Sequence, residues 1–259
     1  MTVVIDLPPG LGEPGVSIDG RIYKYDPIEV KTYRPDIFQN GSFSVFDILV
    51  HLDLKGEINL NYHFNTSMNT HVIDSLNGKA NWWYQIHYSG GSLEKNVDRI
   101  DHYPWKPGAY IQMYQESSSY IQNAFSTFRE EVERLNYNNG SIIIPTVFVS
   151  GYSFNETFYN ITVFPHNLRN ETFQLDVINA LDVIMTLGDL GNITYELTWH
   201  ESFRGASYVH SYFVSKINTD EAVGRCGYLF DVSDSFTWLS ADERIITSPE
   251  SINFYWGCL

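Results

Sequence analysis

The strongest constraint on the fold is an internal repeat, because a chain made of two similar halves is expected to fold into two similar units. Seven segments recur in the same order in both halves, with connections of similar length between them. A stretch with helical spacing, "SVFDILVHL" at 44–52, matches "VINALDVIMTL" at 177–187. A glycine-led alternating stretch follows each, "GEINLNYHF" at 56–64 and "GNITYELTW" at 191–199. The repeat therefore predicts two copies of one α+β unit.

The other repeated segments are rich in β-branched and aromatic residues, which is typical of strands. Proline ends two of them, "PIEVKTYRP" and "NITVFP", so we expect these strands to stop or bend at the proline. The expected strands are 2–7, 27–35, 56–64, 72–78, 82–88 and 108–115 in the first half, and 141–146, 160–165, 191–199, 213–219, 226–232 and 250–256 in the second.

The segment "SSSYIQNAFSTFREEVERLN" at 117–136 has the strongest helical pattern in the chain. Its apolar residues recur at spacings of three and four, and Glu130, Glu131 and Glu133 are expected on the solvated side. We expect this amphipathic helix to pack on one or both halves; a helix exposed for a partner is the alternative. The predicted organisation is a first copy at 1–116, a connecting helix at 117–138, and a second copy with a disulfide at 139–259.

The charge of the chain excludes one large class of partners. Lys and Arg number 16 against 31 Asp and Glu, which gives a formal net charge of −15. Nucleic-acid-binding proteins neutralise phosphates with basic side chains, and these are the scarce charges here. We therefore expect no nucleic acid among the partners. Self-association, or binding to other surface proteins, must rely on apolar, hydrogen-bonded or cation-bridged contacts.

No apolar run reaches the roughly 18 residues that a membrane span needs. The opening "MTVVIDLPPGLGEPG" lacks the basic and then apolar layout of a signal peptide, so we expect a signal peptide to be absent from this numbering. The two cysteines, Cys226 and Cys258, match no zinc pattern. In an exported chain they predict one disulfide, which closes a loop of about 30 residues and adds about 3–4 kcal/mol. Two buried free thiols are the alternative.

Asn-X-Ser/Thr triplets, the acceptors of N-linked glycans, number seven where this composition would give roughly three by chance. Two of them lie in one strand-like stretch, "FNETFYNITVF" at 154–164. If Ile161 and Val163 point inward, Asn160 points outward, where a sugar would cover a face or an edge of the sheet. This density predicts an extracellular or cell-surface glycoprotein. The acceptors are Asn40, Asn65, Asn139, Asn155, Asn160, Asn170 and Asn192.

Four motifs occur in order in the first copy: "SVFDIL", "IDSLNG", "WWYQIHY" and "PGAYI". Through these four motifs, residues 2–115 resemble the transcobalamin C-terminal-like domain family. The second copy resembles the family only through the repeat. The resemblance implies a β-grasp-like fold, a curled and mostly antiparallel sheet with one helix across it, on an exported protein. We thus expect an α+β chain of two tandem β-grasp-like domains joined by an amphipathic helix. The matching residues are Val45, Phe46, Asp47, Leu49, Ile73, Asn77, Gly78, Trp82, Trp83, Tyr84, Pro107, Gly108, Tyr110 and Ile111.

The sequence spells out no catalytic signature, since GxSxG, the phosphate loop and HExxH do not occur in it. We therefore expect no catalytic residues and no enzyme. One weak metal candidate is the pair His87 and His102, which flank the aromatic strand and could bind a metal together with Asp98 or Asp101. The alternative is that these histidines are solvated or hydrogen-bonded in the ordinary way.

A second weak metal candidate is the acidic loop "DVSDSFTWLSADE", which contains Asp231, Asp234, Asp242 and Glu243. It could hold calcium, the one cofactor that the sequence leaves open, although the spacing is not that of an EF-hand. A solvated loop is the default interpretation.

An aromatic set around the fifth expected strand could form a platform on which a sugar stacks, although packing in the core is the favoured interpretation. Its members are Trp82, Trp83, Tyr84, Tyr88, Tyr103 and Trp105.

Three functions follow from these patterns. The favoured one is a glycosylated structural or interaction protein of the cell exterior, a repeating subunit of a filament, sheath or surface layer. Its terminal strands could pair across subunits head to tail, with cations bridging the acidic surfaces. The alternative is that each terminal strand completes a sheet in its own chain. The alternatives are a secreted module that binds carbohydrate or another small ligand, and an accessory subunit of an exported enzyme.

Overall fold

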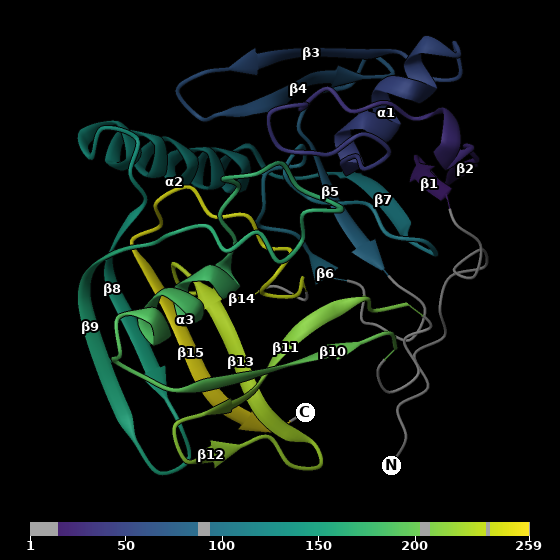
Figure 1. Ribbon diagram of the computed structural model, residues 1–259. Helices are drawn as coiled ribbons and strands as arrows, with labels where there is room; N and C mark the ends of the chain where they lie inside the picture. The colour runs from purple at the N-terminus through teal and green to yellow at the C-terminus, as the bar shows by residue number, and fades with distance from the viewer. Residues whose placement is uncertain (1–14, 88–93, 203–207, 237–238, 259) are drawn as a thin grey trace.

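The computed structural model describes residues 15–87, 94–202, 208–236 and 239–258 (Figure 1). The first half contains β1 (Gly15–Ile18), β2 (Arg21–Tyr23), the 3-10 helix η1 (Pro27–Glu29), α1 (Val45–Leu54), β3 (Leu60–Asn65), β4 (Thr70–Leu76), β5 (Trp82–His87), β6 (Glu94–Lys95) and β7 (Tyr110–Gln115). After α2 (Ser118–Tyr137), the second half contains β8 (Ile143–Ser150), β9 (Asn155–Thr162), α3 (Ala180–Asp189), β10 (Tyr195–His200), β11 (Ser211–Ile217), β12 (Asp220–Glu221), β13 (Cys226–Val232), β14 (Ser235–Phe236) and β15 (Ser251–Cys258). The chain is α+β with mostly antiparallel sheets, as expected.

Each half contains a five-stranded sheet, and the two sheets have the same strand order. The order is β2-β1-β7-β5-β6 in the first half and β9-β8-β15-β13-β14 in the second. Each sheet has one parallel pair, β1 with β7 and β8 with β15, and its other neighbours are antiparallel. Among the described residues, the parallel pair joins the first and last strands of each half. This agreement in topology is what the sequence repeat predicts.

Each half also has an antiparallel hairpin outside its five-stranded sheet, β3–β4 and β10–β11, the second extended by β12. The register shifts at the same place in both hairpins, directly after Asn61 and directly after Glu196. An asparagine with positive φ follows the second strand of each hairpin, Asn77 at 51° and Asn218 at 52°. Asparagine tolerates this left-handed conformation better than most residues do, so the two turns share a physical cause.

The helices of the two halves begin in the same way. Ser44 caps α1 and Asn179 caps α3, and in both helices an aspartate three residues later returns a hydrogen bond to the cap backbone. Such a capping box satisfies amide groups that the first turn leaves without partners. Both helices predicted from the spacing of apolar residues are therefore present, and in Figure 1 α3 lies across one face of the second sheet.

The two halves meet through reciprocal contacts. Phe38 and Phe173, each four residues after an equivalent buried arginine, form an antiparallel bridge, and their ring centroids lie 5.7 Å apart. The side chain of Gln39 donates to Phe173 O at 3.2 Å, and that of Gln174 donates to Phe38 O at 2.9 Å. An interface in which each side repeats the contacts of the other is typical of subunits related by a two-fold axis. The halves thus pack like the subunits of a symmetric dimer.

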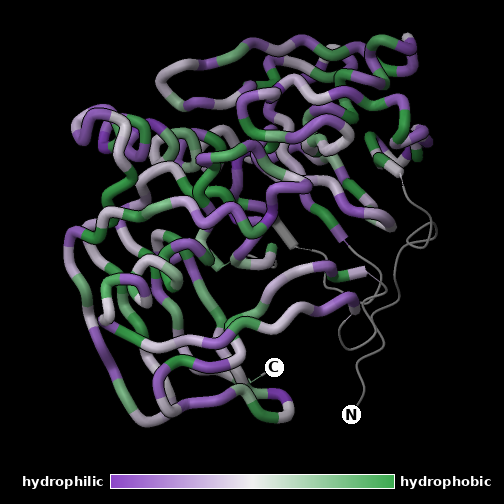
Figure 2. Tube along the Cα trace, viewed as in Figure 1, coloured by the Kyte–Doolittle hydropathy of each residue, from purple (hydrophilic) through white to green (hydrophobic). Residues whose placement is uncertain are grey.

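The connecting helix α2 has no counterpart in the repeat and contacts both halves. Hydrophobic and hydrophilic residues alternate along it in Figure 2, and its buried Ile121 and Phe128 join the core of the first half. At its other end Arg134 Nη1 donates to Ser248 O of the second half at 2.7 Å. The prediction of an amphipathic helix that packs on the body of the protein is confirmed.

Three expectations about strands need correction or fall outside the structure. The segment 27–35 is not a strand: it begins with the helix η1, whose start is capped by Asp26, and continues without strand structure. The expected strand 2–7 lies outside the described residues, and the strand that pairs in parallel with β7 is β1. The carboxyl-terminal strand β15 lies between β13 and β8 of its own chain, so its backbone edges are already paired. With both edges of β15 paired in this way, a head-to-tail contact would have to use another part of the chain, and assembly stays a prediction.

Candidate functional site

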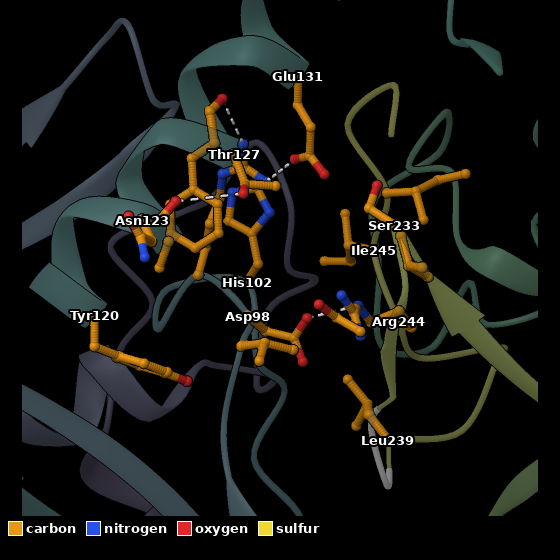
Figure 3. Close-up of a pocket in the computed structure, with 17 residues that line it drawn as sticks. Asp98, His102, Tyr120, Asn123, Thr127, Glu131, Ser233, Leu239, Arg244 and Ile245 are labelled. Carbon is orange, nitrogen blue, oxygen red and sulfur yellow. Dashed lines mark hydrogen bonds and ion pairs between the residues drawn. The ribbon is translucent and has the colours of Figure 1, made fainter. Parts of the chain in front are cut away.

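A cavity with a volume of about 260 Å³ lies between the two halves. Figure 3 shows that α2 forms one wall, with Tyr120, Asn123, Thr127 and Glu131, and that the β13–β15 connection forms the opposite wall. The spacing of three and four residues places these α2 side chains on one face of the helix. Residues of the β6–β7 connection, among them Asp98, lie between the two walls. The cavity therefore exists only because both halves and α2 come together.

Two buried ion pairs line this cavity. Asp98 Oδ1 of the first half lies 2.5 Å from Arg244 Nε of the second half. Arg99 Nη1 donates to Glu131 Oε2 of α2 at 2.6 Å, and Arg99 Nη2 donates to Phe128 O at 3.1 Å. All four of these residues are less than a tenth exposed. Buried charges are tolerated when they are paired in this way, so these pairs fix the position of α2 and of the second half on the first.

His102 is the buried histidine that lines the cavity. Its Nε2 lies 3.0 Å from Asn69 O and 2.9 Å from Arg34 Nη1. Burial first, together with the charges of Arg99 and Arg34, lowers the pKa of His102 to about 3 against the opposing charge of Asp101. The ring is therefore neutral at physiological pH. Its Nδ1 has no hydrogen-bond partner among the described residues.

A hydrogen-bond network around Asp101 holds this histidine in place. Asp101 is fully buried and accepts from Arg34 Nη1 at 3.0 Å, from Thr70 Oγ1 at 2.5 Å, and from the backbone and ring of His71 at 2.9 Å each. Burial alone would raise the pKa of Asp101, but the hydrogen bond from His71 and the charge of Arg34 hold it well below its usual range. Asp101 stays ionised and keeps Arg34 beside His102.

The corresponding loop of the second half contains Asp242 and Glu243, and both are buried. Arg169 Nη1 donates to Asp242 Oδ2 at 2.8 Å and to Glu243 Oε1 at 3.2 Å. Lys106 of the first half crosses the interface, and its Nζ lies 2.5 Å from Glu243 Oε2. The default interpretation of this stretch as a solvated loop is therefore wrong for these two residues. They pair with Arg169 of their own half, and Glu243 also pairs with Lys106 across the interface.

The weak metal candidates do not come together. In the part of the chain that the structure describes, no group of three or more His, Cys, Asp or Glu side chains is arranged to hold a metal ion. His102 is engaged by Arg34 and Asn69, whereas His87 is buried in strand β5. Asp231 Oδ1 accepts from Asn253 at 2.7 Å, and Asp234 is exposed. The proposed histidine pair and the calcium loop therefore lack a ligand set in this structure.

The aromatic set packs in the core instead of forming an exposed platform. Trp82, Trp83 and Tyr84 are at most 6% exposed, and Tyr103 is 3% exposed. Trp105 is half-buried, and Tyr88 lies outside the described residues. The favoured interpretation as core residues is thus correct for the members that the structure describes. Trp82, Trp83 and Tyr84 also line a second cavity of about 180 Å³ between β4, β5 and α2.

All seven acceptor asparagines are described, and none is buried. Six are exposed, but Asn65 is half-buried, and its Oδ1 accepts from Ser67 N at 3.1 Å and from Ser67 Oγ at 2.8 Å. Asn155 and Asn160 lie on β9, which at eight residues is the longest edge strand of either five-stranded sheet. Asn65 ends β3 and Asn192 precedes β10, the outer strands of the two hairpins. Four acceptors therefore lie on or next to outer strands.

The predicted disulfide is confirmed. Cys226 and Cys258 lie directly opposite each other on β13 and β15, with their Cα atoms 4.0 Å apart. The bond joins the start of β13 to the carboxyl end of the chain, 32 residues apart in sequence. Within the described ranges, no helix combines the length and the hydropathy that a membrane crossing requires.

Three charged residues of the cavity were not identified from the sequence: Arg99, Glu131 and Arg244. Glu131 was expected on the solvated side of the connecting helix, but it is 8% exposed. A signal was present, because Glu131 lies three residues after Phe128 and so falls on the apolar face of the helix. Arg99 and Arg244 carry no comparable signal, since the contact between the halves brings them to the cavity.

Comparison with known proteins does not assign the chain to a family. No family model, no curated protein and no solved structure matches it. The resemblance to the transcobalamin C-terminal-like family stays a prediction that rests on the motifs of the first half. The repeated strand order, in contrast, is observed in the structure.

Proposed function

We propose that this chain is a glycosylated structural or interaction protein of the cell exterior, built from two tandem β-grasp-like domains of the transcobalamin C-terminal-like family. The disulfide between Cys226 and Cys258 is compatible with an oxidising compartment. The acceptor asparagines are placed where an oligosaccharide transferase could modify the surface of the chain. The matching strand orders of the two sheets support a division into two domains around α2.

The observation that carries the proposal is the position of two acceptors on β9. An edge strand offers unpaired backbone groups to any other chain, and natural proteins protect such edges. Asn155 and Asn160 are exposed on this strand, and Tyr159 between them is 68% exposed. Glycans at these positions would cover the longest sheet edge of the second half. This explains why a strand carries two acceptors, and it gives the sugars a role in keeping copies of the chain from pairing through β9.

Glycopeptide mass spectrometry of the native protein tests the localisation. We expect Asn155 and Asn160 to carry glycans, and unmodified asparagines at both positions would contradict an extracellular route. The role of these sugars is tested with Asn155→Gln combined with Asn160→Gln, produced in a glycosylating host. We expect light scattering to show more self-association than in the unmodified chain. The matched control, Asn40→Gln with Asn170→Gln, removes two exposed loop acceptors and should not aggregate.

The finer proposal is that the chain is a repeating subunit of a filament, sheath or surface layer. Because β15 is paired on both sides, subunit contacts would have to use other faces, and the net charge of −15 opposes them unless cations bridge the surfaces. Calcium is the cation to test. Electron microscopy and light scattering should show assemblies with calcium that dissolve on chelation; a chain that stays monomeric at high concentration with calcium would contradict this form.

One observation favours the second candidate function, a secreted module that binds a small ligand. The cavity between the halves is lined by polar side chains from three separate segments, an arrangement typical of ligand sites at domain interfaces. The accessory-subunit alternative gains no comparable support from the described residues.

A further inference from the structure

The cavity between the two halves has a balanced set of charges. Asp98 is paired with Arg244, and Glu131 is paired with Arg99. His102 is neutral because burial lowers its pKa to about 3. A charged ligand would bring an uncompensated charge next to these buried, already balanced ion pairs, which is costly. The charge balance therefore favours a ligand without net charge.

The same cavity offers hydrogen bonds that the protein does not use. His102 Nδ1 and Arg244 Nη1 are buried and have no hydrogen-bond partner among the described residues, and both side chains line the cavity. Leaving a buried polar atom without a partner costs about 1–3 kcal/mol, so a ligand that supplies partners gains affinity. The arginine can only donate. The imidazole nitrogen donates or accepts, depending on the tautomer. A hydroxyl group can serve both atoms, because it donates and accepts.

The other wall residues and the volume of the cavity narrow the choice of ligand. Ala124, Phe128, Leu239 and Ile245 provide apolar surface, and Asn123 and Thr127 of α2 provide further polar groups. A volume of about 260 Å³ is below the usual range for drug-sized ligands, about 300–1,000 Å³. We propose that the cavity binds a neutral polyhydroxylated molecule of monosaccharide size, held by hydroxyl contacts to His102 and Arg244 and by its apolar ring face against α2. This site does not depend on the proposed assembly or on glycosylation of the chain.

The test is a binding panel measured by isothermal titration calorimetry and by ligand-observed NMR. Non-glycosylated protein is used, so that sugars attached to the chain cannot interfere. The panel contains glucose, galactose, mannose and N-acetylglucosamine, with glucuronate as the anionic and glucosamine as the cationic comparison. We expect at least one neutral sugar to bind with a dissociation constant on the order of 1 mM or tighter, and to bind at least fivefold tighter than both charged comparisons.

Three variants test whether the sugar binds in this cavity. Thr127 is exposed on α2 at the cavity wall, so Thr127→Trp should block the site without disturbing the core and weaken binding at least tenfold. Ser119→Trp places the same side chain on an exposed position of α2 that does not line the cavity, and should leave the affinity unchanged. Arg244→Lys keeps a cation beside Asp98 but removes the second donor, and should weaken binding at least fivefold.

Three results would overturn the proposal. The first is a lack of binding by every neutral sugar at tens of millimolar. The second is tighter binding of glucuronate or glucosamine than of any neutral sugar, because the charge argument would then be wrong. The third is equal affinity of the Thr127→Trp and Ser119→Trp variants, which would place the bound sugar elsewhere. Each result is independent of whether the native protein is glycosylated or assembled.

Discussion

The two halves share one buried arginine–aspartate contact but use it in different surroundings. Arg34 Nη1 lies 3.0 Å from Asp101 in the first half, and Arg169 Nη1 lies 2.8 Å from Asp242 in the second. Each aspartate also accepts a backbone N–H from the first residues of the second hairpin strand, β4 or β11. The contact ties the loop after the second strand to the loop before the last strand in both halves. Its repetition indicates a structural role that the fold requires twice.

The two halves differ in the residue that follows the aspartate. In the first half it is His102, which is neutral and borders the cavity, and in the second it is Glu243, which is charged and pairs with Lys106 across the interface. The extra carboxylate changes its neighbour: burial first, and then the charge of Glu243, raise the pKa of Asp242 to about 7. The first half therefore has an ionised aspartate beside a polar cavity. In the second half the additional carboxylate forms an ion pair across the interface. A repeated framework can thus serve two purposes.

The largest expected effect comes from breaking the arginine contact in each half. Arg34→Met leaves Asp101 ionised and buried without its main cation, and we expect a loss of about 3–5 kcal/mol in the free energy of unfolding. Arg169→Met should cost less, because Lys106 still neutralises Glu243 and Asp242 can take up a proton. Urea unfolding at pH 7.5 and at pH 6 measures both.

The control for these variants is Arg225→Met, which removes an exposed arginine and should leave the midpoint unchanged. The difference between the two buried variants should widen at pH 6, where Asp242 is more readily protonated. If Arg169→Met is the more destabilising variant at both pH values, the assignment of different roles to the two halves is wrong.

The disulfide is the next largest difference, because it ties the ends of β13 and β15 in the second half only. Replacing both Cys226 and Cys258 by Ser should lower the free energy of unfolding by about 3–4 kcal/mol, as expected for a closed loop of this length. Wild-type protein treated with reductant should then unfold with the same midpoint as the double variant. An unchanged midpoint after complete reduction, checked by thiol titration, would show that the bond does not stabilise the fold.

The pH dependence of stability should have opposite signs in the two halves. Asp242 has its pKa raised from 3.8 to about 7, so its contribution is full below about pH 3.8 and is lost as the pH rises through 7. His102 has its pKa lowered from 6.5 to about 3, so its contribution is full above pH 6.5 and is lost as the pH falls toward 3. Each slope is at most about 1.4 kcal/mol per pH unit.

Two substitutions separate these contributions. Asp242→Asn should remove the contribution to the free energy of unfolding that falls with rising pH. This variant should therefore lose stability on acidification more steeply than wild type. His102→Gln should do the opposite and gain relative stability between pH 6.5 and pH 4. Unfolding midpoints measured at half-unit steps of pH give both slopes. Parallel profiles for wild type and both variants would contradict the assignment.

Much of the architecture could be predicted from the sequence, because local patterns determine it. The helices α1 and α3 follow from the spacing of apolar residues, and the repeat orders the strands. The segment 27–35 was misjudged because its β-branched residues resemble a strand, while Asp26 and Pro27 begin a 3-10 helix. The cavity could not be predicted, since Arg99, Glu131 and Arg244 come from three segments that only the packing of the halves brings together. Contacts between distant segments leave no periodic trace in a sequence.

The smallest expected effect compares the caps of α1 and α3. Ser44 Oγ accepts from Asp47 N at 3.3 Å and donates to Asp47 Oδ2 at 2.7 Å, whereas Asn179 Oδ1 accepts from the backbone of Leu181 at 3.0 Å and of Asp182 at 3.2 Å. Removing a cap costs about 1 kcal/mol, so Ser44→Ala and Asn179→Ala should each shift the unfolding midpoint slightly.

Ser44→Ala should lower the free energy of unfolding more than Asn179→Ala does. Asp47 is buried, and burial raises its pKa against the hydrogen bonds that it accepts, so losing one donor leaves the carboxylate less well satisfied. Asn179→Ala leaves Asp182 with its donors from His166 N at 2.9 Å and from the backbone of residue 179 at 2.8 Å. Urea unfolding of both variants beside Ser119→Ala, on the exposed start of α2, measures the difference. If Asn179→Ala lowers the free energy of unfolding more, this expectation is wrong. The number of backbone amides that donate to the cap would then matter more than the hydrogen bond from the cap to the aspartate.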